Sequence, residues 1–405
     1  MTMIYLDHAA TTPVLPEVAQ AMEPYYDRKY ANPSGLYRSA DLCRQDIESI
    51  RNYLAESIRA RSSEIYFTSG GTESDNWVIK GIRKRYINQR VHYVTSAIEH
   101  HAILRACRSL TDKKTDFTYL GVDENGVIQI KDLDNSLNEQ TVLVSVMLAN
   151  NEVGTIQPIE KISYLCKEHN ILFHTDAVQA YGHIPIDVKK SGIDFMSVSA
   201  HKFGGPKGVG FLYINEDTWL PSMIDGGGQE SGRRSGTENV AGIIGMGTAA
   251  RIAMDHMGED ARKIRELRSY LEKRICMDIP YVRINNPGGK CDGTKTQYPE
   301  QLPGHINLSF QFINGTELVA LMDRENICIS SGSACSSGSG SVSHVISAMG
   351  VPGELAVGTI RITIGRENTI EEMKRTASAL KKCVDYLRKK SSVYEDFCLA
   401  NNEML

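Results

Sequence analysis

The chain has 405 residues, of which 41% are hydrophobic and 23% are charged, and its formal net charge at pH 7 is −4. It is long enough for one large and one smaller globular domain, and its small net charge gives no bulk electrostatic reason to expect nucleic-acid or membrane binding. No apolar run is long enough to span a bilayer and the N-terminus lacks a signal-peptide pattern, so we expect a cytoplasmic protein.

The nine cysteines are an odd number, are widely scattered and contain no CxxC pair. This spacing indicates neither a disulfide framework nor a zinc site. We therefore expect most of the cysteines to be buried, inert thiols, and we expect no metal in the functional site.

Short apolar runs alternate with helical patterns between about residues 60 and 215. The expected strands are Ile65–Thr68, His92–Thr95, Thr141–Leu148, Ile171–Thr175, Phe195–Ser199 and Gly208–Ile214. Helices are expected between them, for example over Asp75–Arg85 and Ile159–His169. This alternation predicts an α/β domain with a mostly parallel sheet, whose ligands bind beyond the carboxyl ends of the strands.

A charged helical stretch over Gly258–Met277 predicts a connection to a second, smaller domain. Strands are expected there at Ile306–Phe310 and Thr359–Ile364, followed by a helix over Ile370–Lys390. The Gly- and Pro-rich segment Asn285–Pro303 predicts a surface loop. The weak periodicity of residues 391–405 predicts little order at the C-terminus.

Lys202 lies among small residues in SAHKFGGPKG (199–208), directly after an apolar run, and Asp176 ends another apolar run in FHTDAVQ (173–179). A lysine in this position can form a Schiff base with pyridoxal phosphate (PLP), and a carboxylate can keep the pyridine nitrogen protonated so that the ring accepts electrons. A buried aspartate requires such a cation, although Asp176 alone is also typical of a helix N-cap. Gln179 is placed to donate to the ring hydroxyl oxygen. The combination favours a PLP site.

The segment TSGGTESDN (68–76) joins an expected strand to an expected helix. Gly70 and Gly71 allow a tight turn, after which Thr72 and the first helical amides can face a phosphate. Ser199 and His201 are further phosphate candidates. The alternative is an ordinary strand–turn–helix corner.

The basic, glycine-rich segment GGGQESGRRSGTENV (226–240) offers Arg233, Arg234 and Thr237 as phosphate ligands, including across a dimer interface. A solvated loop is the alternative. His100, in SAIEHHAI, can stack on a cofactor ring and move protons, or it can be structural, and the neighbouring His101 leaves the choice between them open.

Two motifs can hold a substrate carboxylate. Asn150, Asn151 and Glu152 share one turn in LANNEVGTIQPI (148–159), which also suits an ordinary polar turn. Arg361 alternates with isoleucines in GTIRITIGR (358–366), so it can clamp a carboxylate with two hydrogen bonds, or it can be a surface arginine on an edge strand.

Cys335 lies in the middle of SSGSACSSGSGSVSH (330–344), a run of Gly and Ser that cannot pack a core. An exposed thiol on such a segment is typical of a nucleophile that moves between sites. The alternative is a chance cysteine in a linker.

These motifs together resemble those of cysteine desulfurases of the NifS and IscS kind. In chain order they are YLDHAATTP (5–13), NPSGLYRSA (32–40), TSGGTESDN, EHHA, NNEVG, HTDAVQ, SAHKFGGPKG, GGGQESGRRSGTEN, SSGSACSS and GTIRITIGR, and they cover most of the chain. The resemblance implies a homodimeric fold-type I PLP enzyme that converts L-cysteine to L-alanine. Its large domain has a mostly parallel seven-stranded sheet. We expect that domain over residues 16–260, and a small α+β domain formed by residues 1–15 and 261–405 and carrying Cys335.

The resemblance also implies a role for each candidate residue. Lys202 is the Schiff-base lysine and takes the α-proton, Asp176 pairs with the pyridinium, Gln179 bonds the ring hydroxyl and His100 stacks on the ring. The phosphate ligands are the Gly71–Thr72 turn, Ser199, His201 and, from the other subunit, Thr237. Asn151 and Arg361 hold the substrate carboxylate, and the Cys335 thiolate takes the sulfur as a persulfide.

Two residues depart from the pattern, because His8 stands where many relatives have Asn and Ser231 where an arginine is usual. The sulfur acceptor stays open between iron–sulfur cluster scaffolds and the enzymes of tRNA or cofactor thiolation. A selenocysteine lyase, or another PLP lyase, is an alternative within the same fold. A catalytically inactive scaffold in a sulfur-transfer complex is an alternative of another class, against which the presence of Lys202, Cys335 and Arg361 counts.

Overall fold

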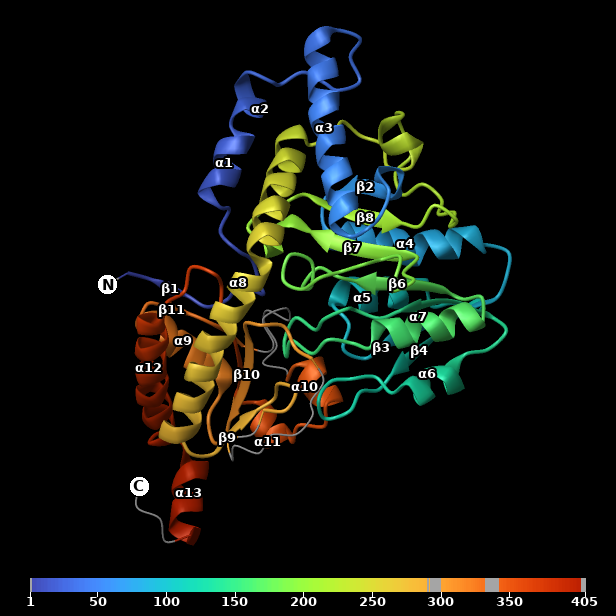
Figure 1. Ribbon diagram of the computed structural model, residues 1–405. Helices are drawn as coiled ribbons and strands as arrows, with labels where there is room; N and C mark the ends of the chain where they lie inside the picture. The colour runs from blue at the N-terminus through green and yellow to red at the C-terminus, as the bar shows by residue number, and fades with distance from the viewer. Residues whose placement is uncertain (1, 290, 292–299, 332–341, 402–405) are drawn as a thin grey trace.

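The computed structural model describes residues 2–289, 291, 300–331 and 342–401. Apolar runs in the first half of the chain form a seven-stranded sheet in the order β2-β8-β7-β6-β5-β3-β4. The strands are β2 (Ile65–Thr68), β3 (Val91–Ser96), β4 (Thr115–Leu120), β5 (Thr141–Ser145), β6 (Leu172–Asp176), β7 (Phe195–Ser199) and β8 (Gly210–Ile214). Only β8 runs antiparallel to its neighbours in this sheet, so the mostly parallel sheet is confirmed (Figure 1).

Among the strands of this sheet, the edge strand β4 is the one that the sequence pattern does not predict. Its Asp116 and Tyr119 are exposed, and only its two end residues are buried. An edge strand of mixed polarity lacks the continuous apolar run by which doubly covered strands are recognised. The other six strands lie where they are expected, with β5 ending earlier, at Ser145.

Side chains along the strands alternate between two apolar cores. Phe195 belongs to the core beneath α4 (Gly71–Arg85) and α5 (His101–Leu110), whereas the next residue, Met196, belongs to the core on the opposite face. That second core is closed by α3 (Arg38–Ser57), α6 (Ile130–Ser136), α7 (Ile159–Glu168) and the first part of α8 (Val240–Asp278). The period of two along each strand therefore places helices on both faces of the sheet.

Short elements complete this part of the chain. They are α1 (Pro16–Met22), α2 (Pro24–Asp27), and the 3-10 turns η1 (Ser62–Glu64), η2 (Ala200–Lys202) and η3 (Gln229–Gly232). The turn η2 directly follows β7 and carries the predicted Schiff-base lysine.

A second sheet is antiparallel and has the order β12-β13-β10-β9. Its strands are β9 (Val282–Ile284), β10 (His305–Phe310), β12 (Ser330–Ser331) and β13 (Thr359–Thr363), and nearby β1 (Ile4–Tyr5) pairs in parallel with β11 (Ile327–Cys328). The helices of this part are α9 (Gly315–Arg324), α10 (His344–Ala348), α11 (Gly353–Ala356), α12 (Ile370–Arg388) and α13 (Ser392–Asn401). Ile360, Ile362 and Ile364 all enter its core, as their alternation with Arg361 predicts.

The helix α8 runs continuously past both sheets (Figure 1). Ala249 and Ala250 pack in the core of the large sheet, whereas Ile264 and Leu267 pack in the core of the small one. The predicted domain boundary at residue 260 falls inside this helix, and the domain limits stay a prediction.

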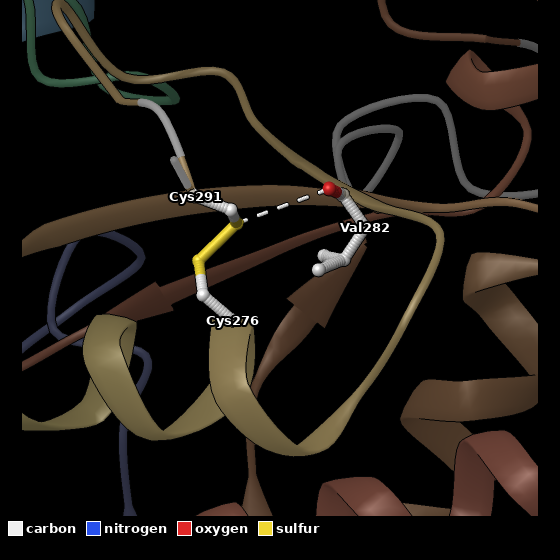
Figure 2. The surroundings of a disulfide bond; sticks show 3 residues. All are labelled: Cys276, Val282 and Cys291. Atoms are coloured by element: carbon white, nitrogen blue, oxygen red, sulfur yellow. Dashed lines mark hydrogen bonds between the residues drawn. A yellow bond between two sulfur atoms is a disulfide. The ribbon is translucent and has the colours of Figure 1, made fainter. Parts of the chain in front are cut away.

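Cys276 and Cys291 form a disulfide, so the expectation of no disulfide is wrong (Figure 2). Cys276 lies near the end of α8, and the chain turns back through β9 so that Cys291 returns to it beside Val282. The spacing of 15 residues between the two cysteines does not match a recognisable disulfide motif. The end of α8 and the return of the chain through β9 bring the two residues together. The expectation of buried thiols is confirmed for Cys43, Cys107, Cys166, Cys383 and Cys398.

The C-terminal residues are more ordered than their weak periodicity predicts, because Ser392–Asn401 form α13. The ring of Phe397 packs on Phe312 and Tyr281, with centroid distances of 4.8 and 5.2 Å. These tertiary aromatic contacts hold a helix whose own sequence pattern is weak. No helix in the described residues has the length and apolar character that crossing a bilayer requires.

Candidate active site

A cavity of about 610 Å³ lies beyond the carboxyl ends of β6 and β7, within the size range of small-molecule sites. Segments from both sheets and from the N-terminus line it. It brings together ten of the residues predicted from sequence, namely Gly71, Thr72, His100, Asn151, Asp176, Gln179, Ser199, His201, Lys202 and Arg361. Residues that lie up to 290 positions apart therefore share one site.

Lys202 ends the turn η2 and lies in the wall of the cavity. Its Nζ donates to the backbone oxygens of Ala9 at 2.6 Å and Ala10 at 2.8 Å. Gln179 donates to the same Ala9 oxygen at 2.9 Å. The N-terminal segment therefore places the lysine amine and the Gln179 amide side by side.

Asp176 ends β6 and is only 5% exposed. Burial raises the pKa of its carboxyl to about 6, against the opposing effects of a hydrogen bond from the Val178 amide and the charge of Lys202. A second carboxyl, Asp75, lines the same cavity, and its Oδ1 has no hydrogen-bond partner among the described residues. Burial and then the charge of Asp176 raise the pKa of Asp75 well above its ordinary value. The raised pKa of Asp75 favours its neutral form, whereas the buried carboxylate of Asp176 requires a cation, which a protonated pyridine nitrogen is.

The turn before α4 has the geometry of a phosphate site. A Cβ on Gly71 would lie 2.5 Å from Cγ2 of Val178, so no larger residue fits there without displacement. The 15-residue helix α4 begins at this point, with Thr72 and Ser199 beside its first amides in the cavity wall. Lys207, which the sequence analysis did not single out, lines the same wall and adds positive charge.

Two histidines of the cavity are neutral at pH 7. Burial, followed by the charge of Lys202, lowers the pKa of both His100 and His201 to about 4. His100 is the N-cap of α5, and its Nδ1 accepts a hydrogen bond from the Ala102 amide at 3.2 Å. Its neighbour His101 does not line the cavity and packs on His344 instead, with ring centroids 4.8 Å apart. The structure therefore distinguishes His100 from His101 as the residue that faces the site.

Arg361 lies on β13, which is an interior strand between β12 and β10, so the alternative of a surface arginine on an edge strand is wrong. The residue is 7% exposed. Its Nη2 donates to Oδ1 of Asp7 at 2.7 Å and its Nη1 donates to the backbone oxygen of Asn151 at 3.1 Å. Its Nε is buried without a hydrogen-bond acceptor among the described residues.

Neighbouring residues of the polar turn at 150–152 have different roles. Asn150 is fully buried, and its side-chain oxygen accepts hydrogen bonds from the amides of Glu152 and Val153, which makes it structural. Glu152 lines the cavity, and its carboxylate accepts a hydrogen bond from the Ser343 hydroxyl at 2.6 Å. Burial raises the pKa of Glu152 to about 7.

Two predicted residues are not placed in this cavity. Thr237 is exposed and does not line it. Cys335 lies outside the described residues, and Ser331, the last described residue before it, lines the cavity. Of the two basic candidates near Thr237, Arg234 pairs with Glu73 at 2.8 Å and Arg233 lies over the ring of Tyr66.

The two departures from the family pattern lie away from the cavity lining. His8 hydrogen-bonds the backbone oxygen of Tyr5 at 3.2 Å and packs so closely on Gly365 that a Cβ there would overlap its ring. Ser231 has a left-handed φ of 57° in η3, beside Glu230, whose carboxylate binds Arg51.

A lysine after one strand and a carboxylate at the end of its parallel neighbour define a PLP-dependent enzyme of fold type I. A model of the class-V aminotransferase family matches residues 4–376. A protein named cysteine desulfurase IscS from Clostridium botulinum strain Hall is 44% identical over 394 residues, which cover 97% of each chain. The chain belongs to the cysteine desulfurases of the class-V aminotransferase family.

Solved structures agree with this assignment. One described as a NifS-like protein matches with a TM-score of 0.87 and 36% identity, covering 95% of this chain and 100% of the other. Another, described as SspA in complex with cysteine, matches with a TM-score of 0.77 and 33% identity over 91% of this chain and 100% of the other.

The cofactor of this family is PLP, and the residues around the cavity fit it. The amine of Lys202, the buried carboxylate of Asp176 and the α4 turn match the aldehyde, the ring nitrogen and the phosphate. Within the described ranges, no group of three or more His, Cys, Asp or Glu side chains is arranged to hold a metal ion.

Proposed function

We propose that this chain converts L-cysteine to L-alanine and takes the sulfur onto Cys335 as a persulfide for delivery to an acceptor. The observation that carries the proposal is that Lys202, Asp176 and Arg361 line one cavity, next to the strand that leads toward Cys335. The likeness to proteins named cysteine desulfurase, and to a structure with bound cysteine, supports the choice of substrate.

Bound PLP supplies an electron sink for negative charge at the substrate α-carbon. Lys202 holds the cofactor, and its amine takes and returns the α-proton. Asp176 would place its carboxylate against the ring nitrogen, and neutral His100 would add no competing positive charge near the ring. Gln179 would bond the ring hydroxyl, while Thr72, Ser199 and His201 would bind the phosphate.

At the other end of the cavity, Arg361 and Asn151 orient the substrate carboxylate. Nη1 and Nη2 of Arg361 each use one N–H in the bonds to Asn151 and Asp7, so the second N–H of each would be a donor for such a carboxylate. The Cys335 thiolate then attacks the substrate sulfur, so that an S–S bond forms as the C–S bond breaks and the electron pair remains with the carbon skeleton. Protonation of that skeleton leads to alanine.

We further propose a homodimer in which Thr237 reaches the phosphate of the partner's cofactor. A surface hollow joins Pro33, Ser34 and Arg44 to the segment from Gly228 to Glu238. Large apolar side chains are exposed in the stretch of chain from residue 26 to residue 42, which includes Pro33 and Ser34, namely Tyr26, Tyr30, Leu36, Tyr37 and Leu42. A second copy would bury these side chains and bring Thr237 to the site. A monomeric mass in analytical ultracentrifugation would contradict this arrangement.

The proposed function also includes a cell compartment and a class of sulfur acceptor. The chain would act in the cytoplasm and supply sulfur to iron–sulfur cluster assembly or to thiolation of tRNA or cofactors. Relatives named cysteine desulfurase IscS support cysteine as the source of that sulfur.

The test measures alanine release from L-cysteine in the presence of a reductant, with the wild type and Cys335→Ala. We expect release by the wild type and none by the variant, with cofactor absorbance equal in both. Equal release would overturn the role of Cys335 and favour a lyase that needs no persulfide, for which selenocysteine is the next substrate. No release by either protein, despite bound cofactor, would overturn the proposed substrate.

A further inference from the structure

We propose that Asp7 is a positioning residue, which sets the orientation of the Arg361 guanidinium for the substrate carboxylate. The inference rests on the proposed function, because it assumes that Arg361 binds an amino-acid carboxylate. Asp7 is not one of the ligand-binding residues identified from the sequence, although it lies in the YLDHAATTP segment.

The guanidinium of Arg361 is held by two acceptors from different parts of the chain. One is the carboxylate of Asp7, at 2.7 Å from Nη2, and the other is the backbone oxygen of Asn151, at 3.1 Å from Nη1. Because the guanidinium is planar, two fixed acceptors on two of its nitrogens also fix the directions of its remaining N–H groups. Nε is buried without an acceptor in the described structure, and Nη1 and Nη2 each keep a second N–H beside the one used in these bonds.

Asp7 can act in this way because its own backbone is held firmly. The amide of Leu6 donates to the oxygen of Cys328, and the amide of Thr363 donates to the oxygen of Leu6 at 2.8 Å. The Ala9 amide donates to the Thr363 hydroxyl at 2.9 Å. Asp7 itself bridges to Thr363, two residues from Arg361 on the same strand. The segment that carries Asp7 is therefore attached on both sides to the strand that carries Arg361.

A competing acceptor explains why orientation matters. The carboxyl of Glu152 lies close enough to Arg361 for the positive charge to oppose the burial-driven rise of the Glu152 pKa. Without Asp7, only the backbone oxygen of Asn151 would hold the guanidinium, and the carboxyl of Glu152 would be left to attract it. An Arg361 turned toward Glu152 would present its donors in the wrong direction for the substrate.

The experiment compares the PLP-loaded wild type with Asp7→Ala, Asp7→Asn and Asp7→Glu. The ligands are L-cysteine and cysteamine, which has the same thiol and amine but no carboxylate. Binding is followed by the change in cofactor absorbance, and KM and kcat are measured by alanine release from L-cysteine. Tyr5→Phe is the matched control, because the Tyr5 hydroxyl holds the same segment through the backbone oxygens of Asp7 and Thr11 and makes no hydrogen bond to Arg361 in the described structure.

For Asp7→Ala we expect KM for L-cysteine to rise about tenfold, the order expected when a charge-assisted hydrogen bond is lost, with a smaller change in kcat. Asp7→Asn keeps an acceptor oxygen, so it should restore KM to within about threefold of the wild type. Asp7→Glu keeps the charge but moves it by one methylene, and it should resemble Asp7→Ala. Cysteamine should bind equally to all four proteins, and Tyr5→Phe should leave KM unchanged.

An unchanged KM for L-cysteine in Asp7→Ala, or in Asp7→Glu should the alanine variant fail to fold, would overturn the proposal. Equal losses for cysteamine, or the same loss in Tyr5→Phe, would also overturn it and leave Asp7 a purely structural role. Arg361→Ala separates this result from a failure of the proposed function. If that variant binds L-cysteine normally, the assignment of Arg361 is wrong, and the inference about Asp7 fails with it.

Discussion

The two ends of the cavity are built in different ways. At the end that we propose binds the cofactor, here called the cofactor end, Asp176 and Lys202 lie within three residues of the ends of adjacent strands β6 and β7. At the substrate end, Arg361 depends on Asp7, which is 354 residues away in the sequence, and on the backbone of Asn151. The first end follows from local strand–turn geometry, whereas the second is assembled from distant segments. Changes at the cofactor end should therefore act on the chemistry, and changes at the substrate end on affinity.

The largest effect is expected from Lys202→Ala, which breaks the cofactor end alone. Loss of the amine that we propose holds the cofactor and moves the α-proton should lower kcat by at least about 10²- to 10⁴-fold. Alanine release and cofactor absorbance measure the result. Because Lys202 also donates to Ala9 and Ala10, an unfolding midpoint measured alongside should show whether the N-terminal segment stays in place. Turnover at the wild-type rate would remove Lys202 from the mechanism.

The second-largest effect is expected from removal of the disulfide, which lies outside both ends of the cavity. Removing the Cys276–Cys291 disulfide with Cys276→Ser should lower the free energy of unfolding by about 3 kcal/mol, the value expected for a closed loop of this length. Urea unfolding without reductant measures it, with Cys43→Ser, which removes a buried free thiol, as the control. The KM for L-cysteine should change little. If the wild type and Cys276→Ser have equal stability, the disulfide is not formed in solution.

The smallest effect is a pH dependence at the cofactor end. His100 has a pKa of about 4 in the folded chain, below its ordinary value, because burial and Lys202 disfavour the imidazolium. Between pH 6.5 and 4 the unfolded chain therefore binds the extra proton first, so the contribution of His100 to stability is lost as the pH falls.

His100→Asn retains an N-cap acceptor for α5 but does not titrate. We expect the difference in unfolding free energy between the cofactor-free wild type and this variant to decrease as the pH is lowered from 7 to 5. Urea unfolding at the two pH values measures this difference. A difference that is independent of pH would mean that His100 is accessible to protons in the folded chain.

Local sequence was sufficient for the cofactor end of the site. Lys202 and Asp176 each follow an apolar run that forms a buried strand, and parallel strands place such positions at one edge of the sheet. Gly70 and Gly71 mark the turn before α4 because few other residues suit that backbone and that contact with Val178. In each case the sequence pattern that predicts the position lies within a few residues. The order of the elements along the chain and the alternation of side chains along each strand then determine where the residue is placed.

Tertiary structure alone decided the remaining features. The pairing of Asp7 with Arg361, the disulfide between Cys276 and Cys291, and the packing of α13 on Phe312 all join segments whose approach depends on the whole fold. The same holds for the choice of His100 over His101, because it depends on which ring the start of α5 turns toward the cavity. Contacts of this kind depend on how all the elements of both cores pack together, and no short stretch of sequence determines that packing.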